Sequence, residues 1–262
     1  MDPALLTAAT GMMAQQTRTD VIANNLANIN TTGFKRSRAD FEDLLYQTVQ
    51  NGAVIGSPDA ETALPIQIGR GTRLAGVQPL QTQGNPEQTG RNLDVAIEGA
   101  GYFQVQLPSG DTAYTRDGSF NVSDQGTIVT QDGYAVMPNI KVPQDATGIT
   151  ISSTGEVTAT RGSSNTTIDL GRIELATFAN PSGLLNDGQN LLSPTPSSGD
   201  PVAGYPGENG MGQLLQGSLE GSNVQVVQEM VDMITAMRAY EINSKAITNA
   251  DQMQQMADNL IR

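Results

Sequence analysis

The stretch Val21-Ile22-Ala23-Asn24-Asn25-Leu26-Ala27-Asn28-Ile29-Asn30-Thr31-Thr32-Gly33-Phe34-Lys35 places three asparagines within five positions of an otherwise apolar, helix-like segment. Asparagine costs up to ~0.7 kcal/mol relative to alanine at an interior helical position, so we expect these amides to make contacts. Asn24 and Asn28 lie one turn apart and share a helical face. An amide buried between helices fixes their register at some cost in stability. The stretch predicts a face on which helices dock, with a fraying helix end as the alternative.

This segment closes a longer helical pattern that begins at the front of the chain. Asp2 supplies an N-cap oxygen, and Pro3 suits the first helical position. Apolar and small residues then recur at a spacing of three and four, which predicts a helix over residues 3–29. Gly33 is the predicted C-terminal stop of this helix.

A second long helix is predicted at the other end of the chain, over residues 223–260. Ser222 and Gln225 fit a capping box, in which Ser222 is the N-cap and Gln225 reaches back to it. An apolar stripe follows, with a change of phase near Tyr240. Each helix has too few apolar residues to stand alone, so we expect the two to pack as a coiled coil and to pack on other copies of the chain. A private two-helix core inside one subunit is the alternative.

Between the helices the hydrophobic period changes to two. Leu93, Val95 and Ile97 alternate with polar or small residues, and turn signals such as Asp117-Gly118 recur between short β-rich runs. We therefore predict an α+β chain with a central antiparallel all-β domain. The predicted division is a discontinuous helical domain (1–34 and 222–262), a connecting segment with an extended arm (35–74), the β domain (75–192) and a return connector (193–221).

Composition excludes several classes of function. The formal net charge of −13 argues against binding to nucleic acid, which requires Lys and Arg to neutralise phosphates. The absence of cysteine and histidine removes thiolate sites, Ser-His-Asp and Cys-His catalysis and the commonest zinc ligand. No apolar run approaches the ~20 residues of a membrane span. We expect no cofactor, no metal and no embedding in a membrane.

The first residues lack the basic and apolar regions of a cleaved secretory signal. We expect a protein that stays in the cytosol or is exported by a route that reads no cleaved signal. Asp124-Gln125-Gly126 and Asp132-Gly133 lack the ligand ladder of a calcium loop and are interpreted as turns. A carboxylate pair for glycoside hydrolysis is not excluded by counting, since Asp and Glu total 27.

Five segments of the chain are distinctive: residues 23–28 with 32–35, 94–103, 114–120, 216–224 and 238–246. In this order they closely resemble the flagellar basal-body rod and hook family of axial proteins, and the resemblance covers nearly the whole chain. Within the family, the length and the run Phe41-Glu42-Asp43-Leu44-Leu45-Tyr46-Gln47-Thr48 favour a subunit toward the distal end of the rod. The opening Met1-Asp2-Pro3-Ala4 departs from the usual start.

The resemblance implies a non-enzymatic subunit of a rigid helical tube that transmits torque across the periplasm. It implies export through the flagellar type III apparatus without signal cleavage. The expected partners are other copies of the chain, proximal rod and hook-side axial proteins, and the ring proteins of the periplasm and outer membrane. A proximal rod or hook subunit is the near alternative. A secreted helical effector or adhesin and a cell-wall glycoside hydrolase are the distant ones.

The residues expected to pack between subunits lie on the two terminal helices. Methionine in these stripes suits adaptable packing, and thin stripes favour completion by neighbouring copies. The predicted set is Ile22, Asn24, Asn25, Leu26, Asn28, Ile29, Val227, Met230, Ile234, Met237, Ile242, Met253, Met256 and Leu260.

Overall fold

The computed structural model describes residues 3–50, 66–162 and 166–260. The chain divides into two compact units. We name the first the helical unit (residues 1–26, 37–78 and 225–262) and the second the β unit (residues 27–36 and 79–224). The predicted α+β class, with terminal helices and a central antiparallel β region, is confirmed.

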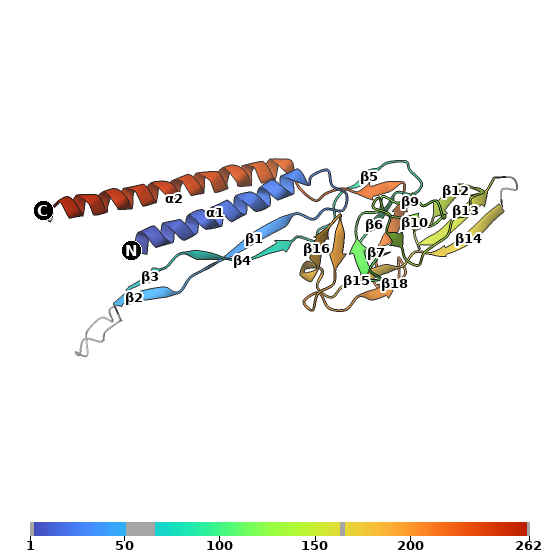
Figure 1. Cartoon of the computed structure of the whole chain (residues 1–262), viewed down its shortest axis with the longest axis horizontal. Coiled ribbons are helices and arrows are strands. Elements are labelled where there is room, and N and C mark those ends of the chain that lie inside the picture. The colour runs from blue at the N-terminus through green and yellow to red at the C-terminus, as the bar shows by residue number, and fades with distance from the viewer. Residues whose placement is uncertain (1–2, 51–65, 163–165, 261–262) are drawn as a thin grey trace, which may run out of the picture. The chain divides into compact units, whose positions relative to one another are not determined.

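The helical unit contains both long helices and two β ribbons (Figure 1). Helix α1 ends two residues earlier than predicted, and α2 begins three residues later than predicted. In the first ribbon β1 pairs with β4, and in the second β2 pairs antiparallel with β3. The elements are α1 (Pro3–Ala27), β1 (Ser37–Asp43), β2 (Tyr46–Gln50), β3 (Ile66–Gly69), β4 (Thr72–Pro79) and α2 (Val226–Leu260).

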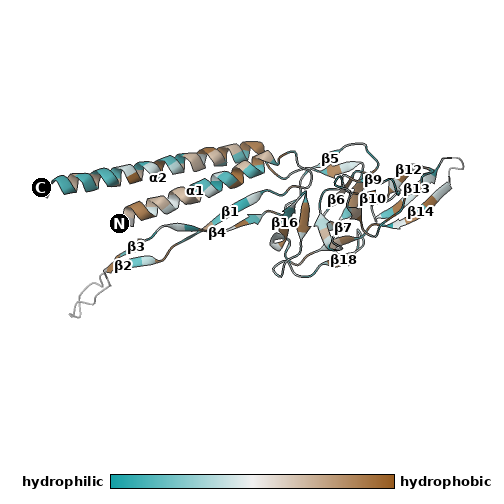
Figure 2. Ribbon diagram, in the orientation of Figure 1, coloured by the Kyte–Doolittle hydropathy of each residue, from teal (hydrophilic) through white to brown (hydrophobic). Residues whose placement is uncertain are grey.

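The four ribbon strands fall within or next to the predicted connecting segment (35–74). Residues 51–65 of the predicted arm lie outside the described residues. Helices α1 and α2 run side by side in opposite directions. Hydropathy falls along α2, from apolar near its beginning to polar near its C-terminal end (Figure 2).

The β unit is built around a nine-stranded sheet whose main path runs β16-β17-β8-β7-β11-β10-β9, with β15 joining β7 to β18. A three-stranded sheet, β12-β13-β14, and two pairs, β19-β6 and β20-β5, complete it. The strands are β5 (Pro86–Gln88), β6 (Val95–Glu98), β7 (Tyr102–Gln106), β8 (Thr112–Thr115), β9 (Asn121–Val122), β10 (Ile128–Val129), β11 (Ala135–Val136), β12 (Ala146–Ile151), β13 (Glu156–Arg161), β14 (Thr166–Arg172), β15 (Leu175–Thr177), β16 (Leu185–Gly188), β17 (Leu191–Ser193), β18 (Val202–Gly204), β19 (Gln213–Gln216) and β20 (Ser218–Glu220). A 3₁₀ turn, Pro181–Gly183, precedes β16.

The core of the β unit lies under β6, β7 and β15. Phe103 and Phe120 meet edge to face with ring centroids 5.0 Å apart, and both are fully buried. The alternation around Val95 and Ile97 predicts one buried face, but Ala96 between them is buried as well. Strand β6 is therefore covered on both sides, which the alternating pattern did not indicate.

Three strands lie inside the predicted return connector, residues 193–221. Among the described strands, β18 pairs with β15 alone, β19 pairs with β6, and β20 pairs with β5. Proline confines a strand to the edge of a sheet, which fits the position of β18 immediately after Pro201. The connector is thus part of the β unit and contributes to its sheets.

Candidate subunit-packing site

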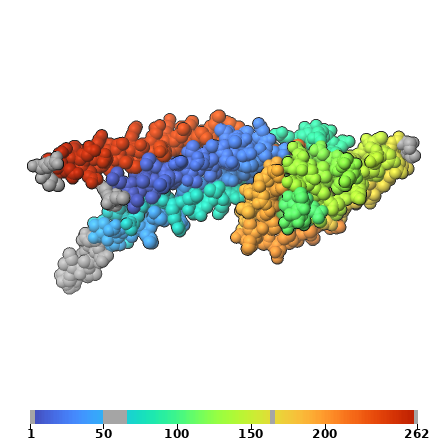
Figure 3. All heavy atoms as spheres, in the orientation of Figure 1, coloured from blue at the N-terminus to red at the C-terminus, as the bar shows by residue number. Residues whose placement is uncertain are grey.

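The two helices of the helical unit meet at points seven residues apart along α1. A Cβ atom on Gly11 would lie 2.8 Å from Nδ2 of Asn243, so α1 and α2 approach closely there. Arg18 forms an ion pair with Asp232 across a distance of 3.4 Å. Asn25 contacts Glu229 near the other end of the pair. Figure 3 shows α1 and α2 in contact along one face of this unit.

Asn25 is the buried amide of the asparagine stretch, with 1% of its surface exposed. Its Nδ2 donates to Oε2 of Glu229 at 3.2 Å and to the carbonyl oxygen of Ser37 at 2.9 Å. Its Oδ1 accepts the backbone N–H of Ser37 at 2.8 Å. Both ends of the amide are therefore used within one subunit, where they hold the start of β1 and the start of α2 against α1.

The other members of the predicted set on α1 lie in mixed surroundings. Ile22 is buried, Leu26 and Ile29 are half-buried, and Asn24 is exposed. Asn28 is half-buried and belongs to the turn after α1, where its Oδ1 accepts the hydroxyl of Thr31 at 3.1 Å. Asn24 and Asn28, which share a face in a continuous helix, fall in different units because α1 ends at Ala27.

The predicted stripe on α2 is exposed in the single chain. The side of α2 that packs on α1 carries Glu229, Ala236 and Ala250 as its buried residues, and these are acidic or small. The apolar face of α2, which we define as Val227, Met230, Val231, Ile234 and Met237, is 49% to 76% exposed. Ile242, Met253 and Met256 are exposed as well, while the side chain of Leu260 lies outside the described residues.

A second cluster, which the sequence did not indicate, lies inside the β unit. Glu220 is fully buried, and its Oε1 accepts Nζ of Lys35 at 2.5 Å while its Oε2 accepts Nη1 of Arg116 at 3.1 Å. The backbone N–H of Gly84 also donates to Oε1 at 3.0 Å. We name Lys35, Arg116 and Glu220 the buried charge cluster. Burial lowers the pKa of Lys35 from its usual value near 10.5, an effect that Glu220 opposes and Arg116 adds to.

This cluster joins three of the segments that carry the family resemblance. Gly33 has a left-handed backbone (φ +68°), and a Cβ there would lie 2.9 Å from Cβ of Arg116. Its N–H donates to the carbonyl oxygen of Glu220 at 2.8 Å. Gly33 was predicted to stop the first helix, which is wrong because the helix ends at Ala27. The glycine instead allows the close approach of these segments.

The predicted capping box at Ser222 and Gln225 is wrong as well. Helix α2 begins at Val226, and the carbonyl oxygen of Gln225 accepts the N–H of Glu229 at 3.0 Å, which makes Gln225 the N-cap. Ser222 instead accepts the N–H of Val224 in a local turn. The neighbouring Asn223 is occupied in the β unit, where its Oδ1 accepts the N–H of Arg36 at 2.7 Å.

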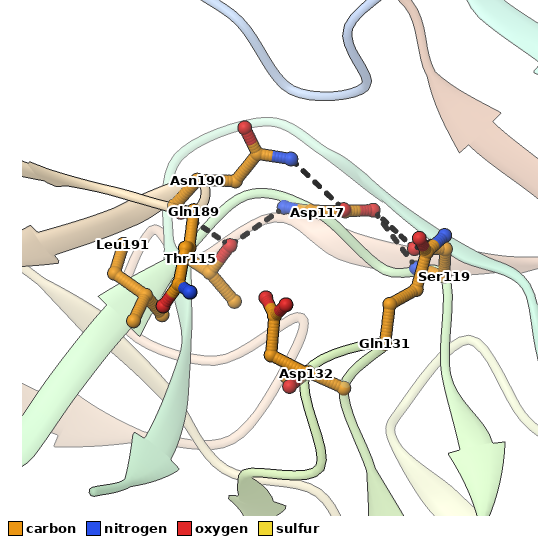
Figure 4. A pocket seen from close by; sticks show the side chains of 9 residues that line it. Thr115, Asp117, Ser119, Gln131, Asp132, Gln189, Asn190 and Leu191 are labelled. Atoms are coloured by element: carbon orange, nitrogen blue, oxygen red, sulfur yellow. Dashed lines mark hydrogen bonds between the residues drawn. The ribbon is translucent and has the colours of Figure 1, made fainter.

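A polar pocket on the β unit holds the carboxylates of Asp117 and Asp132 (Figure 4). Oδ1 of Asp117 accepts the N–H and the hydroxyl of Ser119 at 3.0 and 2.7 Å, and Oδ2 accepts Nδ2 of Asn190 at 3.1 Å. Thr115 accepts the N–H of Asp117 and donates to the carbonyl oxygen of Asn190. Asp117 therefore braces the turn after β8 against the loop before β17.

Within the described ranges, no three His, Cys, Asp or Glu side chains gather as they would around a metal ion. None of the described helices combines the length and the apolar character needed to cross a bilayer.

Three segments of the chain match known protein families. Residues 5–35 match the flagella basal body rod protein family, residues 96–159 match the flagellar hook protein FlgE/F/G D1 domain, and residues 215–260 match the flagellar basal body rod FlgEFG protein C-terminal family. The first match ends at Lys35, the second contains Arg116, and the third contains Glu220, so each contributes one member of the buried charge cluster.

Full-length relatives extend these matches. The chain is 50% identical over 261 residues to the flagellar basal-body rod protein FlgG of Borreliella burgdorferi, covering 99% of this chain and 98% of the relative. It is 52% identical over 251 residues to the protein of the same name from Agrobacterium fabrum, covering 95% and 96%. The FlgG protein of Bacillus subtilis is 41% identical over 263 residues, covering 98% of each chain. This chain belongs to the flagellar basal-body rod protein FlgG family, whose members are structural subunits of the flagellar basal body.

Proposed function

We propose that this chain is a structural subunit of the flagellar distal rod that assembles into a helical tube and transmits torque from the motor to the hook. The observation that carries this proposal is the uncovered apolar face of α2. Removal of an aliphatic side chain such as Ile234 from water contributes about 1.5–3 kcal/mol. A face of five such residues is far more stable against a partner than against solvent, and identical subunits offer identical faces.

The terminal helices of neighbouring copies form the coiled-coil lining of this tube. The small and polar residues between α1 and α2 in one subunit support this assignment, because they bring the two helices close without using the large apolar side chains. Gly11 opposite Asn243 is the clearest such position. The predicted packing residues on α2 then meet neighbouring subunits, whereas Asn25 sets the register inside its own.

The segment that we predicted as an extended arm stiffens the tube by lying along neighbouring copies. An isolated two-stranded ribbon is marginally stable in water. The β2–β3 ribbon nevertheless exposes Tyr46, Val49, Ile66 and Ile68, each at least half exposed. Deletion of residues 47–75 is expected to give soft or short assemblies, and straight full-length tubes from the deletion variant count against the proposal.

The same assignment places the chain in the periplasmic part of the basal body, reached through the flagellar type III export apparatus. Its neighbours along the axis are proximal rod and hook-side proteins, and its outer surface runs inside the ring proteins of the periplasm and outer membrane.

Electron microscopy of the purified chain at rising concentration tests the central claim. We expect helical tubes above a critical concentration and dispersed monomers below it. Dispersed particles at every concentration, in buffers where the β unit is folded, contradict self-assembly. If the chain were instead a cell-wall hydrolase, it would show hydrolase activity, and that activity would be lost on changing Asp117 or Asp132.

A further inference from the structure

The β unit has a second pocket, which is separate from the Asp117 pocket and encloses about 650 Å³ of empty space that includes open solvent. It is lined by residues before β6, at the turn between β6 and β7, and after β15. Tyr102, Phe178 and Pro181 form apolar walls, and Arg116 of the buried charge cluster lies at its edge. We name it the Arg116 pocket.

The charge beside this pocket is not balanced. Lys35 and Arg116, each with 8% of the side chain exposed, share the single carboxylate of Glu220, so the cluster carries one positive charge in excess. Both oxygens of Glu220 are already used, because Oε1 accepts from Lys35 and Gly84 and Oε2 accepts from Arg116. A buried charge without a counterion costs several kcal/mol, which favours an anion here.

Arg116 also has an unused donor. Nη1 donates to Glu220 and to the carbonyl oxygen of Ile97, and Nη2 donates to the carbonyl oxygen of Gly99 at 2.7 Å. Nε is buried and finds no acceptor among the described residues. The guanidinium carbon lies 5.3 Å from the ring centroid of Tyr102, which is one of the apolar walls.

The remaining polar groups of the pocket are occupied. Tyr102 donates its hydroxyl proton to Oε1 of Gln81 at 2.9 Å, and Nε2 of Gln81 donates to the carbonyl oxygen of Pro181. Gln83 bonds the backbone at Ile97 and at Gly99. The pocket therefore combines apolar walls with an adjacent buried positive charge, a combination that suits a carboxylate next to an apolar side chain.

We propose that the Arg116 pocket receives the segment Asp43-Leu44-Leu45-Tyr46 of a second copy of this chain, a proposal that rests on the self-assembly proposed above. Leu45 is 87% exposed, the largest value among the large apolar side chains that the structure describes. Asp43 is exposed two residues away, and Tyr46 is 56% exposed. The N–H of Leu44 is held by the carbonyl oxygen of Gly71, so Leu45 projects from an anchored backbone. The carboxylate of Asp43 meets Arg116, and Leu45 packs on Tyr102 and Phe178.

Thiol cross-linking tests this contact, because the chain contains no cysteine and engineered thiols are the only ones present. Leu45→Cys and Thr177→Cys are prepared as separate variants, since Thr177 lines the pocket and is half-buried. Equal amounts are mixed, assembled into tubes, and joined by oxidation or by a short bismaleimide. We expect a mixed dimer at several times the yield of a control pair, Leu185→Cys with Thr177→Cys, since Leu185 is exposed at 57%.

Each outcome decides the inference. Normal tubes with no mixed dimer above the control overturn it and leave the proposed function intact, whereas failure of the wild-type chain to form tubes overturns both. Cross-linking of a doubly substituted chain within itself at high dilution assigns the pocket to its own segment and also overturns the inference.

A second pair of variants avoids thiol chemistry. Asp43→Asn with Leu45→Ser is expected to raise the critical concentration for tubes at least tenfold, while Leu185→Ser changes it less than twofold. Equal critical concentrations for the two contradict the proposal, and circular dichroism of the monomers checks that both variants are folded.

Discussion

The two units of this chain bury their large apolar side chains to very different degrees. In the β unit, Phe103, Phe120, Ile97 and Leu175 are fully buried, and even the ionic groups of the charge cluster are shielded from water. In the helical unit, the largest apolar side chains of α2 face solvent, and the buried residues among those described on α2 are Glu229, Ala236 and Ala250. The β unit therefore has a closed hydrophobic core, whereas the helical unit leaves the apolar face of α2 exposed to solvent. We infer that the β unit is stabilised within one chain and that the helical unit gains its main stability when copies meet.

The largest effect is expected inside the β unit, on replacing Glu220 with alanine. Removal of this carboxylate leaves Lys35 and Arg116 as two buried cations without a counterion, which should cost about 3–5 kcal/mol of unfolding free energy. Denaturant unfolding of the monomer, followed by near-ultraviolet circular dichroism, measures it. Glu87→Ala, an exposed carboxylate in the same unit, is the matched control. Equal unfolding free energies of the two variants would contradict the claim that the stability of the β unit depends on its buried charge cluster.

The next effect tests the helical unit and is expected in assembly alone. Ile234→Glu places a carboxylate in the apolar face of α2 and should raise the critical concentration for tubes about 10- to 100-fold, because the transfer energy of an isoleucine is about 1.5–3 kcal/mol. Gln254→Glu adds the same charge at an exposed position outside that face. Sedimentation separates assembled tubes from free chain and gives the critical concentration of both variants. A large loss of monomer stability in Ile234→Glu would show that the face is already covered within one chain.

A smaller effect is expected on replacing Asn25. This replacement tests whether the amide sets the register of α1 and α2 inside one subunit or docks one subunit on another. Asn25→Ala removes three hydrogen bonds and leaves the carboxylate of Glu229 buried, which should cost about 1–3 kcal/mol. Faster hydrogen exchange at the N–H of Ser37 in the monomer is the direct measurement. Asn24→Ala, at an exposed neighbouring position, should leave this exchange unchanged. If only assembly responds to Asn25→Ala, the intramolecular role is wrong.

The smallest effect is a pH dependence of the β unit that comes from Lys35. Because the fold lowers the pKa of Lys35 below 10.5, the unfolded chain binds more protons at this residue between the lowered pKa and 10.5. The unfolding free energy therefore rises with pH in that window, by at most about 1.4 kcal/mol per pH unit, and the gain is lost as the pH falls through the lowered pKa. Lys35→Arg keeps the charge but does not titrate there. We expect a steeper slope of the unfolding free energy in the pH range just below 10.5 for the wild type than for this variant, and identical slopes contradict it.

Periodicity predicted the elements that depend on local pattern. The two helices follow from repeated apolar spacing, and their ends differ from the prediction by two or three residues. Four residues of the exposed face of α2 belong to the stripe that the sequence predicts, and Val231 is an addition from the structure. The capping box predicted at Ser222 is wrong because the neighbouring Asn223 belongs to the β unit, where its Oδ1 accepts the backbone N–H of Arg36. A local capping rule does not contain that long-range contact.

The buried charge cluster could not be predicted from the sequence in the same way. Lys35 and Glu220 are 185 residues apart, and Arg116 lies in the middle of the chain. Each of them is one of many charged residues, and no spacing connects them. The only signal available was that each lies in a segment carrying the family resemblance. The same limit applies to Asn25, whose partners Ser37 and Glu229 are fixed by the path of the chain after α1.

The distance along the chain between Lys35 and Glu220 has a consequence for the order of folding. Closing so long a loop is slow, and the contacts that the loop brings together stabilise the chain only after the loop has closed. If the chain becomes available from one end, whichever end comes first, one member of the cluster is present long before the other. The buried charge cluster of the β unit can therefore form only after nearly the entire polypeptide is available.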